Sequence, residues 1–273
     1  MIAAVAASGC GAEDSAKDAA SKAKDAIDPV AQASETTSSQ HGGIAMTLKG
    51  GVTSGTEKVP LNGHGVVDRA GKKGTFTFTL PIGGRSVTLD EIIVGKVIYI
   101  GGKAFAGQLP DGRKWVKVDL AAEAAKQGLD LDALGNSATQ DPSSALEYLK
   151  GAGTSRKVGS ATVGGTQTTQ YHVDVDLRKV AAKSDDPDAK SSVEKLIKIT
   201  GTPTLPIDVW VDGHHLVRRE KLAYDMTVKG QKTSLDLTID LTKFGVDVHA
   251  DAPPAGDVAD ASAVMGGQGT TSS

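Results

Sequence analysis

The chain has 273 residues, 39% of them hydrophobic, and a formal net charge of -3. This length and hydrophobic content suffice for a true core, and we expect one large domain. The small negative net charge gives no indication of a basic surface for binding nucleic acid or an anionic membrane. A single cysteine excludes a disulfide framework, and no apolar run approaches the roughly 20 residues that cross a bilayer.

The lone cysteine, Cys10, closes a short apolar start and precedes a polar stretch. The sequence Ala7-Ser8-Gly9-Cys10 resembles the lipobox of bacterial lipoproteins, in which the cysteine sulfur receives a diacylglyceryl group and becomes residue one after cleavage. We therefore assign 1–9 to a signal-peptide remnant and Cys10 to lipidation. Met1–Ala7 has no Lys or Arg and is short for a secretory apolar core, which indicates a misassigned start or a trimmed sequence. The alternative is a fortuitous Ser-Gly-Cys near an ordinary N-terminus.

Two segments that can bury little flank the expected domain. Residues 10–27 are mostly Ala, Lys, Asp and Ser and form the lipidated tether, which would reach roughly 50 Å when extended. Asp28-Pro29 predicts a helix start, and the helix should continue to about Ser38. The folded domain is expected over 28–249. Residues 250–273 contain Pro253-Pro254 and many small residues, which predicts a disordered tail.

Apolar residues alternate with polar ones along most of the domain, which is typical of half-buried strands. Asp212-Gly213, Gly83-Gly84 and Gly230 mark turns between them. One polar and one apolar face indicate an antiparallel sheet, because parallel strands buried on both faces have continuous apolar runs. The alternating stretches are Ile44–Leu48, Phe76–Leu80, Tyr171–Leu177, Ile207–Val211, Leu222–Val228 and Leu235–Leu241.

Three helical stretches can cover the apolar face of this sheet: Leu120–Gln127, Pro142–Lys150 and Pro187–Lys198. Asp141-Pro142 supplies an N-cap and a first-turn proline for the second stretch. The third presents Val193, Leu196 and Ile197 on one side. The sequence therefore predicts a single α+β domain, a meandering antiparallel sheet with helices on its apolar side.

The order of these segments carries a family resemblance. Trp115–Leu120 runs into a helix, and Asp141-Pro142 precedes Leu146 and Leu149; Gly164–Thr166 precedes Tyr171–Leu177, and Pro206–Asp212 precedes Arg218-Arg219. This order resembles the actinobacterial LppX/LprG-like lipoprotein family over about Pro29 to Val248. The resemblance rests on pattern and order and on no catalytic signature.

The resemblance implies a fold like that of the LolA/LolB carriers, a strongly curved antiparallel sheet forming a half-barrel, with helices closing its concave apolar face over a cavity. It also implies lipid or lipoglycan carriage across the cell envelope, with no cofactor and no reaction. We accordingly expect a monomer anchored at the extracytoplasmic face of the cell membrane. A transporter of the envelope is a candidate partner, and nucleic acid is not.

A carrier of acyl chains needs apolar volume, because a chain offers no hydrogen-bonding groups and each buried CH₂ contributes about 0.8 kcal/mol. The same apolar residues would equally fill a solid core, and the alternative function is a solid-cored structural or sensory envelope module that binds a protein. We predict that the lining of the cavity consists of Phe76, Phe78, Leu80, Leu89, Leu146, Leu149, Val209, Leu222, Tyr224, Met226 and Leu237.

Catalytic and metal-binding patterns are weak in this sequence. There is no Gly-x-Ser-x-Gly, and the six histidines have none of the short spacings of a zinc site, so we expect neither an enzyme nor a metal protein. Trp115 and Trp210 suit sheet packing better than ligand contact. Arg218-Arg219 with Arg113-Lys114 would form a basic rim for an anionic headgroup, or belong to solvated strand faces.

Overall fold

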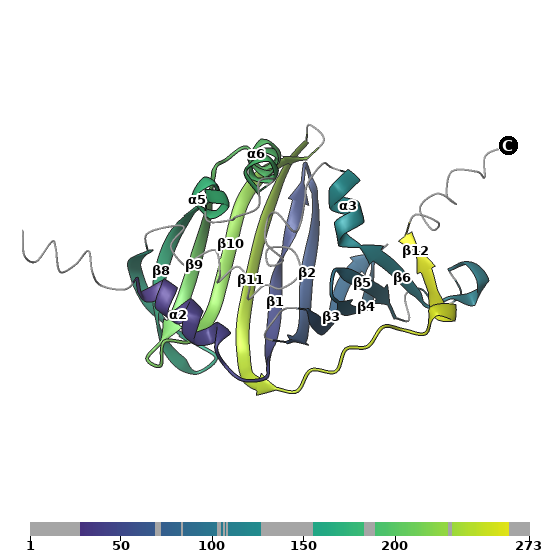
Figure 1. Ribbon diagram of the computed structural model, residues 1–273, viewed down its shortest axis with the longest axis horizontal. Helices are drawn as coiled ribbons and strands as arrows, with labels where there is room; N and C mark the ends of the chain where they lie inside the picture. The colour runs from purple at the N-terminus through teal and green to yellow at the C-terminus, as the bar shows by residue number, and fades with distance from the viewer. Residues whose placement is uncertain are drawn as a thin grey trace, which may run out of the picture.

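A computed structural model describes residues 28–68, 72–82, 84–102, 105, 107, 109–126, 155–182, 189–228 and 231–261. These residues build one open sheet of 12 strands in the order β12-β6-β5-β4-β3-β2-β1-β11-β10-β9-β8-β7 (Figure 1). Every neighbouring pair is antiparallel except β12 and β6. The fold is the α+β half-barrel that the sequence predicts.

The strands are β1 (Gly43–Ser54), β2 (Glu57–Val67), β3 (Lys73–Ile82), β4 (Arg85–Val94), β5 (Val97–Gly101), β6 (Trp115–Asp119), β7 (Ser155–Val163), β8 (Thr166–Asp176), β9 (Thr204–Asp212), β10 (Val217–Val228), β11 (Gln231–Val246) and β12 (Val258–Asp260). Two meanders, β1 to β6 and β7 to β11, meet where β11 pairs with β1. This pairing brings together strands nearly 200 residues apart in sequence, for example Leu48 opposite Ile239. The register places the three turns β1–β2, β3–β4 and β10–β11 at one end of the sheet, hereafter the hairpin end.

Helix α2 (Pro29–Ser38) begins where the sequence predicts, because Asp28 caps it. Asp28 Oδ1 accepts hydrogen bonds from the amides of Val30 (2.9 Å) and Ala31 (3.2 Å), and Pro29 occupies the first turn. Asp28 Oδ2 also accepts from the amide of Ser155 at 2.9 Å, which ties the helix start to the edge strand β7. Two other predicted helices are present, α3 (Leu120–Lys126) and α6 (Ala189–Thr200). The stretch 142–150 lies outside the described residues.

A short helix, α5 (Leu177–Ala182), begins where the alternation predicts the last residue of a strand. Leu177 is the first residue of this helix, because Asp176 Oδ1 accepts hydrogen bonds from the amides of Arg178 (2.9 Å) and Lys179 (3.2 Å). An aspartate directly before an apolar-basic run is an N-cap signal that the strand pattern hides. Leu177 nevertheless stays in the core, at 5% exposure.

The structure also differs from the expectation of a disordered tail over residues 251–261. A 3-10 turn, η4 (Ala255–Asp257), leads into β12, which pairs in parallel with β6, Ala259 lying opposite Val116. The Lys114 amide donates to the carbonyl of Asp257, and Arg113 Nη1 donates to the carbonyl of Val258 at 2.8 Å. These backbone partners lie about 140 residues upstream, so composition alone could not reveal them.

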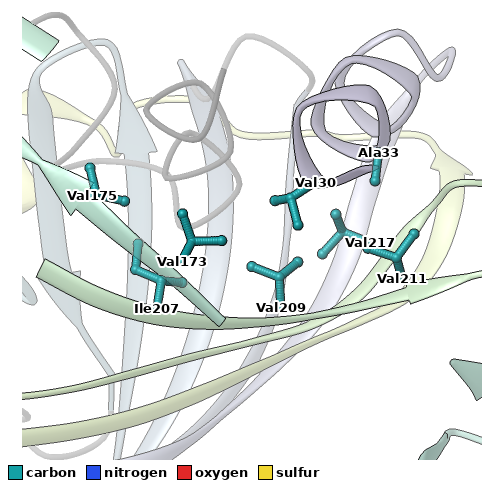
Figure 2. Close-up of a cluster of buried hydrophobic side chains, with 8 residues drawn as sticks. All are labelled: Val30, Ala33, Val173, Val175, Ile207, Val209, Val211 and Val217. Atoms are coloured by element: carbon teal, nitrogen blue, oxygen red, sulfur yellow. The ribbon is translucent and has the colours of Figure 1, made fainter. Parts of the chain in front are cut away.

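The helices α2, α5 and α6 cover one face of the sheet in the region of β8 to β10 (Figure 1). Val30 and Ala33 of α2 pack on valines and an isoleucine from β8, β9 and β10, including Val209 at 0% exposure (Figure 2). Thr37 Oγ1 accepts a hydrogen bond from the amide of Val217 at 2.9 Å, and this bond holds α2 against β10. A second cluster, around Met46 and Ile239, fills the same face between β1, β2, β3, β4 and β11. We call this face the inner face.

Candidate functional site

The inner face consists of cross-strand rows of apolar residues. In one row Leu89, Phe78, Gly63, Leu48 and Ile239 lie opposite one another from β4 to β11. A neighbouring row contains Leu61 of β2, Gly50 of β1, Leu237 of β11, Leu222 of β10 and Ile207 of β9. Because side chains of period two share a face, these rows extend one apolar surface over most of the sheet.

The packing of this surface changes along the strands. Away from the hairpin end it is fully buried, as at Ile44, Val67 and Ile93, each at 3% exposure or less. Towards the hairpin end the side chains become half-buried, and the opposed pair Val52 and Val59 is exposed, at 37% and 42%. The face is thus a solid core at one end and an incompletely covered apolar surface at the other.

Nine of the eleven predicted lining residues are described, and all nine lie on the inner face. Phe76 and Val209 are fully buried in the two packed clusters, at 4% and 0% exposure. Seven are half-buried: Phe78, Leu80, Leu89, Leu222, Tyr224, Met226 and Leu237. Leu146 and Leu149 lie outside the described residues.

The seven half-buried residues divide further by what they touch. Phe78, Leu222 and Leu237 pack against the packed clusters, and Leu222 contacts both of them. The other four belong to no buried cluster of the described chain: Leu80, Leu89, Tyr224 and Met226. Leu89 lies opposite Phe78, and the other three lie nearer the turns of the β3–β4 and β10–β11 hairpins. We call these four residues the rim group.

Sequence reasoning missed several residues of the same face. Ile98 and Ile100 of β5 lie opposite Ile93 and Glu91 and are half-buried. They belong to Val97–Gly101, in which apolar residues follow one another without interruption. The sequence pattern therefore could not indicate which face of the sheet each side chain occupies. Leu61, Val87 and Leu235 were missed as well, and they are also half-buried.

Two aromatic rings lie flat over glycines in the middle of the inner face. The rings of Phe76 and Phe78 are stacked, with centroids 5.9 Å apart and an interplanar angle of 16°. A methyl group added at Gly63 would lie 2.5 Å from Cδ1 of Phe78, and one at Gly65 would meet the ring of Phe76. Strand glycines without side chains therefore make room for these rings and let the sheet bend.

Glu91 of β4 interrupts this apolar surface. It lies at an inward position, opposite Phe76 on β3 and Ile100 on β5, between Leu89 and Ile93 of its own strand. Burial removes water from the carboxylate and raises the pKa of Glu91 to about 7. No hydrogen bond or ion pair within the described part of the chain reaches this carboxyl group.

Two further polar side chains occupy inward positions of β10. Glu220, opposite Ile239 and Val209, is fully buried at 0% exposure. Tyr224 is half-buried in the rim group, and burial raises the pKa of its phenol. Three residues with ionisable carboxyl or guanidinium groups occupy inward positions of β1 to β5. Glu57 and Arg85 lie exposed at hairpin turns, and Glu91 is the third.

The opposite face of the sheet carries the paired charges. Arg219 Nη2 donates to Asp240 Oδ2 at 2.8 Å, and its guanidinium lies 5.7 Å from the ring centre of Trp210. Trp210 packs on this outer face at 8% exposure, and Trp115 packs over Gly101. Both tryptophans therefore pack on the sheet, as the sequence favours.

The suggested basic rim does not form. Arg113 and Lys114 bond to residues at the β6–β12 edge, whereas Arg218 and Arg219 belong to β10, at the other side of the sheet order. Arg218 donates to Asp212 Oδ2 at 2.7 Å in the β9–β10 turn. Burial disfavours the charge on Asp212, but the Leu216 amide, Arg218 and the His214 amide outweigh that effect and lower the pKa of Asp212.

The described residues contain no group of three or more His, Cys, Asp or Glu side chains close enough together to hold a metal ion. Within the same residues, no helix has the length and apolarity to span a bilayer.

The fold and the inner face together define an α+β half-barrel with one apolar, incompletely covered face. Among solved structures, the chain is similar to LprF from Mycobacterium bovis (12% identity, 83% of this chain and 96% of that chain covered, TM-score 0.44). It is also similar to the lipoprotein LppX from Mycobacterium tuberculosis (12% identity, 82% and 96% covered, TM-score 0.43) and to a LolA superfamily protein from Nitrosomonas europaea (9% identity, 84% and 96% covered, TM-score 0.28).

LppX and the LolA superfamily are groups that the order of segments in the sequence resembles. No protein-family model matches the chain, and neither does any curated protein.

Proposed function

We propose that this protein binds lipid acyl chains against its inner face and carries them within the cell envelope without catalysing a reaction. The observation that supports the proposal most is the gradient of burial along the inner face, from a solid core to the half-buried rim group and the exposed pair Val52 and Val59. A solid-cored module would be expected to bury such a surface from end to end, because exposed apolar area is unfavourable.

The chemistry of the surface suits an acyl chain. Its half-buried side chains are almost all Leu, Ile, Val, Met and Phe, which offer contact area and few hydrogen bonds. At about 0.8 kcal/mol per buried CH₂, one long chain contributes roughly 10 kcal/mol before the costs of binding. A lipid could therefore be held without a specific polar contact, and the lipid or lipoglycan headgroup would remain outside.

We further propose that Cys10 carries the lipid anchor and that residues 10–27 form the tether, outside the cytoplasm. The motif Ala7-Ser8-Gly9-Cys10 supports this proposal. Expression of the full chain and of Cys10→Ser in a bacterial host tests it. Cys10→Ser should lose the added lipid mass at the N-terminus and leave the membrane fraction, and equal membrane retention of both proteins would contradict the anchor.

Native mass spectrometry of the non-acylated Cys10→Ser chain tests lipid binding. We expect a bound lipid after expression, or uptake of one from mixed micelles. A protein that carries no lipid and takes none up would contradict the carrier function. The identity of a retained lipid would also name the ligand class.

A bulky substitution in the rim group separates a carrier from the solid-cored module that binds a protein. Met226→Trp should abolish or strongly reduce lipid binding while the thermal unfolding temperature changes little, because the new ring fills space intended for ligand. In a solid core the same change costs about 1–3 kcal/mol through overpacking. Ala223→Trp is the matched control, since Ala223 lies exposed on the outer face of the same strand.

A further inference from the structure

Glu91 places a carboxyl group in the middle of the apolar inner face, where we propose that lipid binds. Glu91 lies six residues from Arg85 at the β3–β4 turn, so about 20 Å of strand separates it from the hairpin end. That distance is within the reach of a long acyl chain that enters from the half-buried side. A chain bound along β4 would therefore pass over the Glu91 side chain.

We propose that Glu91 couples lipid binding to proton uptake: the inner face accepts an acyl chain over Glu91 when its carboxyl group is neutral and releases the chain when the group is ionised. The inference rests on the proposed function and adds the control of binding. An acyl chain laid over a carboxylate removes the remaining water from the charge and supplies no partner, which is unfavourable. The neutral acid has a much smaller penalty.

The surroundings of Glu91 make this coupling specific to one group. On β3 its inward neighbours are Gly74, Phe76 and Phe78, and on β5 they are Ile98 and Ile100, none of which titrates. The nearest titratable residues in the register, Asp90, Tyr99 and Lys117, lie on the outer face. Helix α3, which contacts β6, carries Glu123 and Lys126, and these two are paired with each other at 2.6 Å.

The direction of the effect follows from burial. Because burial already raises the pKa of Glu91 to about 7, the group is largely protonated at pH 6 and largely ionised at pH 8. A covering chain raises the pKa further, so the complex holds the proton at a pH where the free protein has lost it. Lipid affinity should then fall as the pH rises through 7.

The test uses the Cys10→Ser chain and an uncharged probe, a diacylglycerol with pyrene at the end of one acyl chain, whose own charge does not change with pH. Fluorescence titrations between pH 5.5 and 8.5 give the dissociation constant. For one proton with a free-protein pKa near 7, the wild type should bind about tenfold more weakly at pH 8 than at pH 6. Glu91→Gln should bind equally at both pH values, and at pH 8 about tenfold more tightly than wild type.

The control variant is Asp90→Asn, on the outer face next to Glu91, which should keep the wild-type pH dependence. Calorimetry at pH 7.5 in two buffers of different ionisation enthalpy gives a second readout, and net proton uptake should be seen with wild type and not with Glu91→Gln. A flat wild-type curve, or a slope that survives in Glu91→Gln, overturns the coupling and leaves lipid carriage standing. Failure of wild type and Glu91→Gln to bind the probe at pH 6 overturns both.

Discussion

Glu91 also ties the stability of the protein to pH, independently of any ligand. Its carboxyl group has a pKa of about 7 in the folded protein, above the ordinary value of 4.5. Between these two values the folded protein holds a proton that the unfolded chain has lost, so the free energy of unfolding falls as the pH rises from about 4.5 to about 7.

Replacement of Glu91 by Gln should remove this loss. Above pH 7 we expect Glu91→Gln to be more stable than wild type by between about 1 and 3 kcal/mol, and below pH 4.5 the two should be alike. Urea denaturation at pH 4.5 and pH 8 measures both differences, with Asp90→Asn as the control. Equal stability of wild type and Glu91→Gln at pH 8 would show that the carboxylate is well solvated in the folded state.

At the scale of elements, Asp28 joins two parts of the chain that are far apart in sequence. One carboxylate oxygen caps α2, and the other accepts the amide of Ser155 at the start of β7. Because α2 covers the β8 to β10 region, its position also determines how much of the inner face stays covered.

We expect Asp28→Ala to lower the free energy of unfolding by about 1–2 kcal/mol for the lost cap, with a further loss because the Ser155 amide loses its partner. Asp28→Asn separates the two effects, since its amide oxygen can cap the helix while its NH₂ cannot accept from Ser155. Chemical denaturation should rank wild type first, Asp28→Asn second and Asp28→Ala last. Identical stabilities for wild type and Asp28→Asn would mean that the bond to Ser155 contributes nothing.

For the whole molecule, β12 forms one edge of the sheet, as the outermost strand beside β6. It covers the outer edge of β6, with Ala259 at 2% exposure. Without it, β6 would become an edge strand with unpaired backbone groups.

A chain that ends at Ala250 should therefore show faster amide hydrogen exchange over β6, while exchange over β8 stays unchanged. The matched control ends at Ala261 and keeps β12. Exchange measured by mass spectrometry on peptides covering Trp115–Asp119 and Thr166–Asp176 distinguishes the two. Unchanged exchange over β6 in the shorter chain would contradict a structural role of β12.

Much of this architecture is readable in the sequence because alternation has a local cause. Leu222, Tyr224 and Met226 alternate with polar residues, and they share a face for the same geometric reason that any strand has two faces. Asp28-Pro29 likewise specifies a helix start through local hydrogen bonds and a fixed dihedral angle. The nine described residues of the predicted lining share one face for this reason, and their role as a lipid-binding lining stays a prediction.

Tertiary structure alone decided what depends on partners distant in the chain. The pairing of β1 with β11 and of β6 with β12, the solid packing around Phe76 and Val209, and the half-burial of the rim group all depend on which strands meet. Alternation marks a face as apolar but cannot say what covers it. The sequence determined the strands and their apolar side through local geometry, whereas the extent of burial, and with it the raised pKa of Glu91, required the assembled sheet.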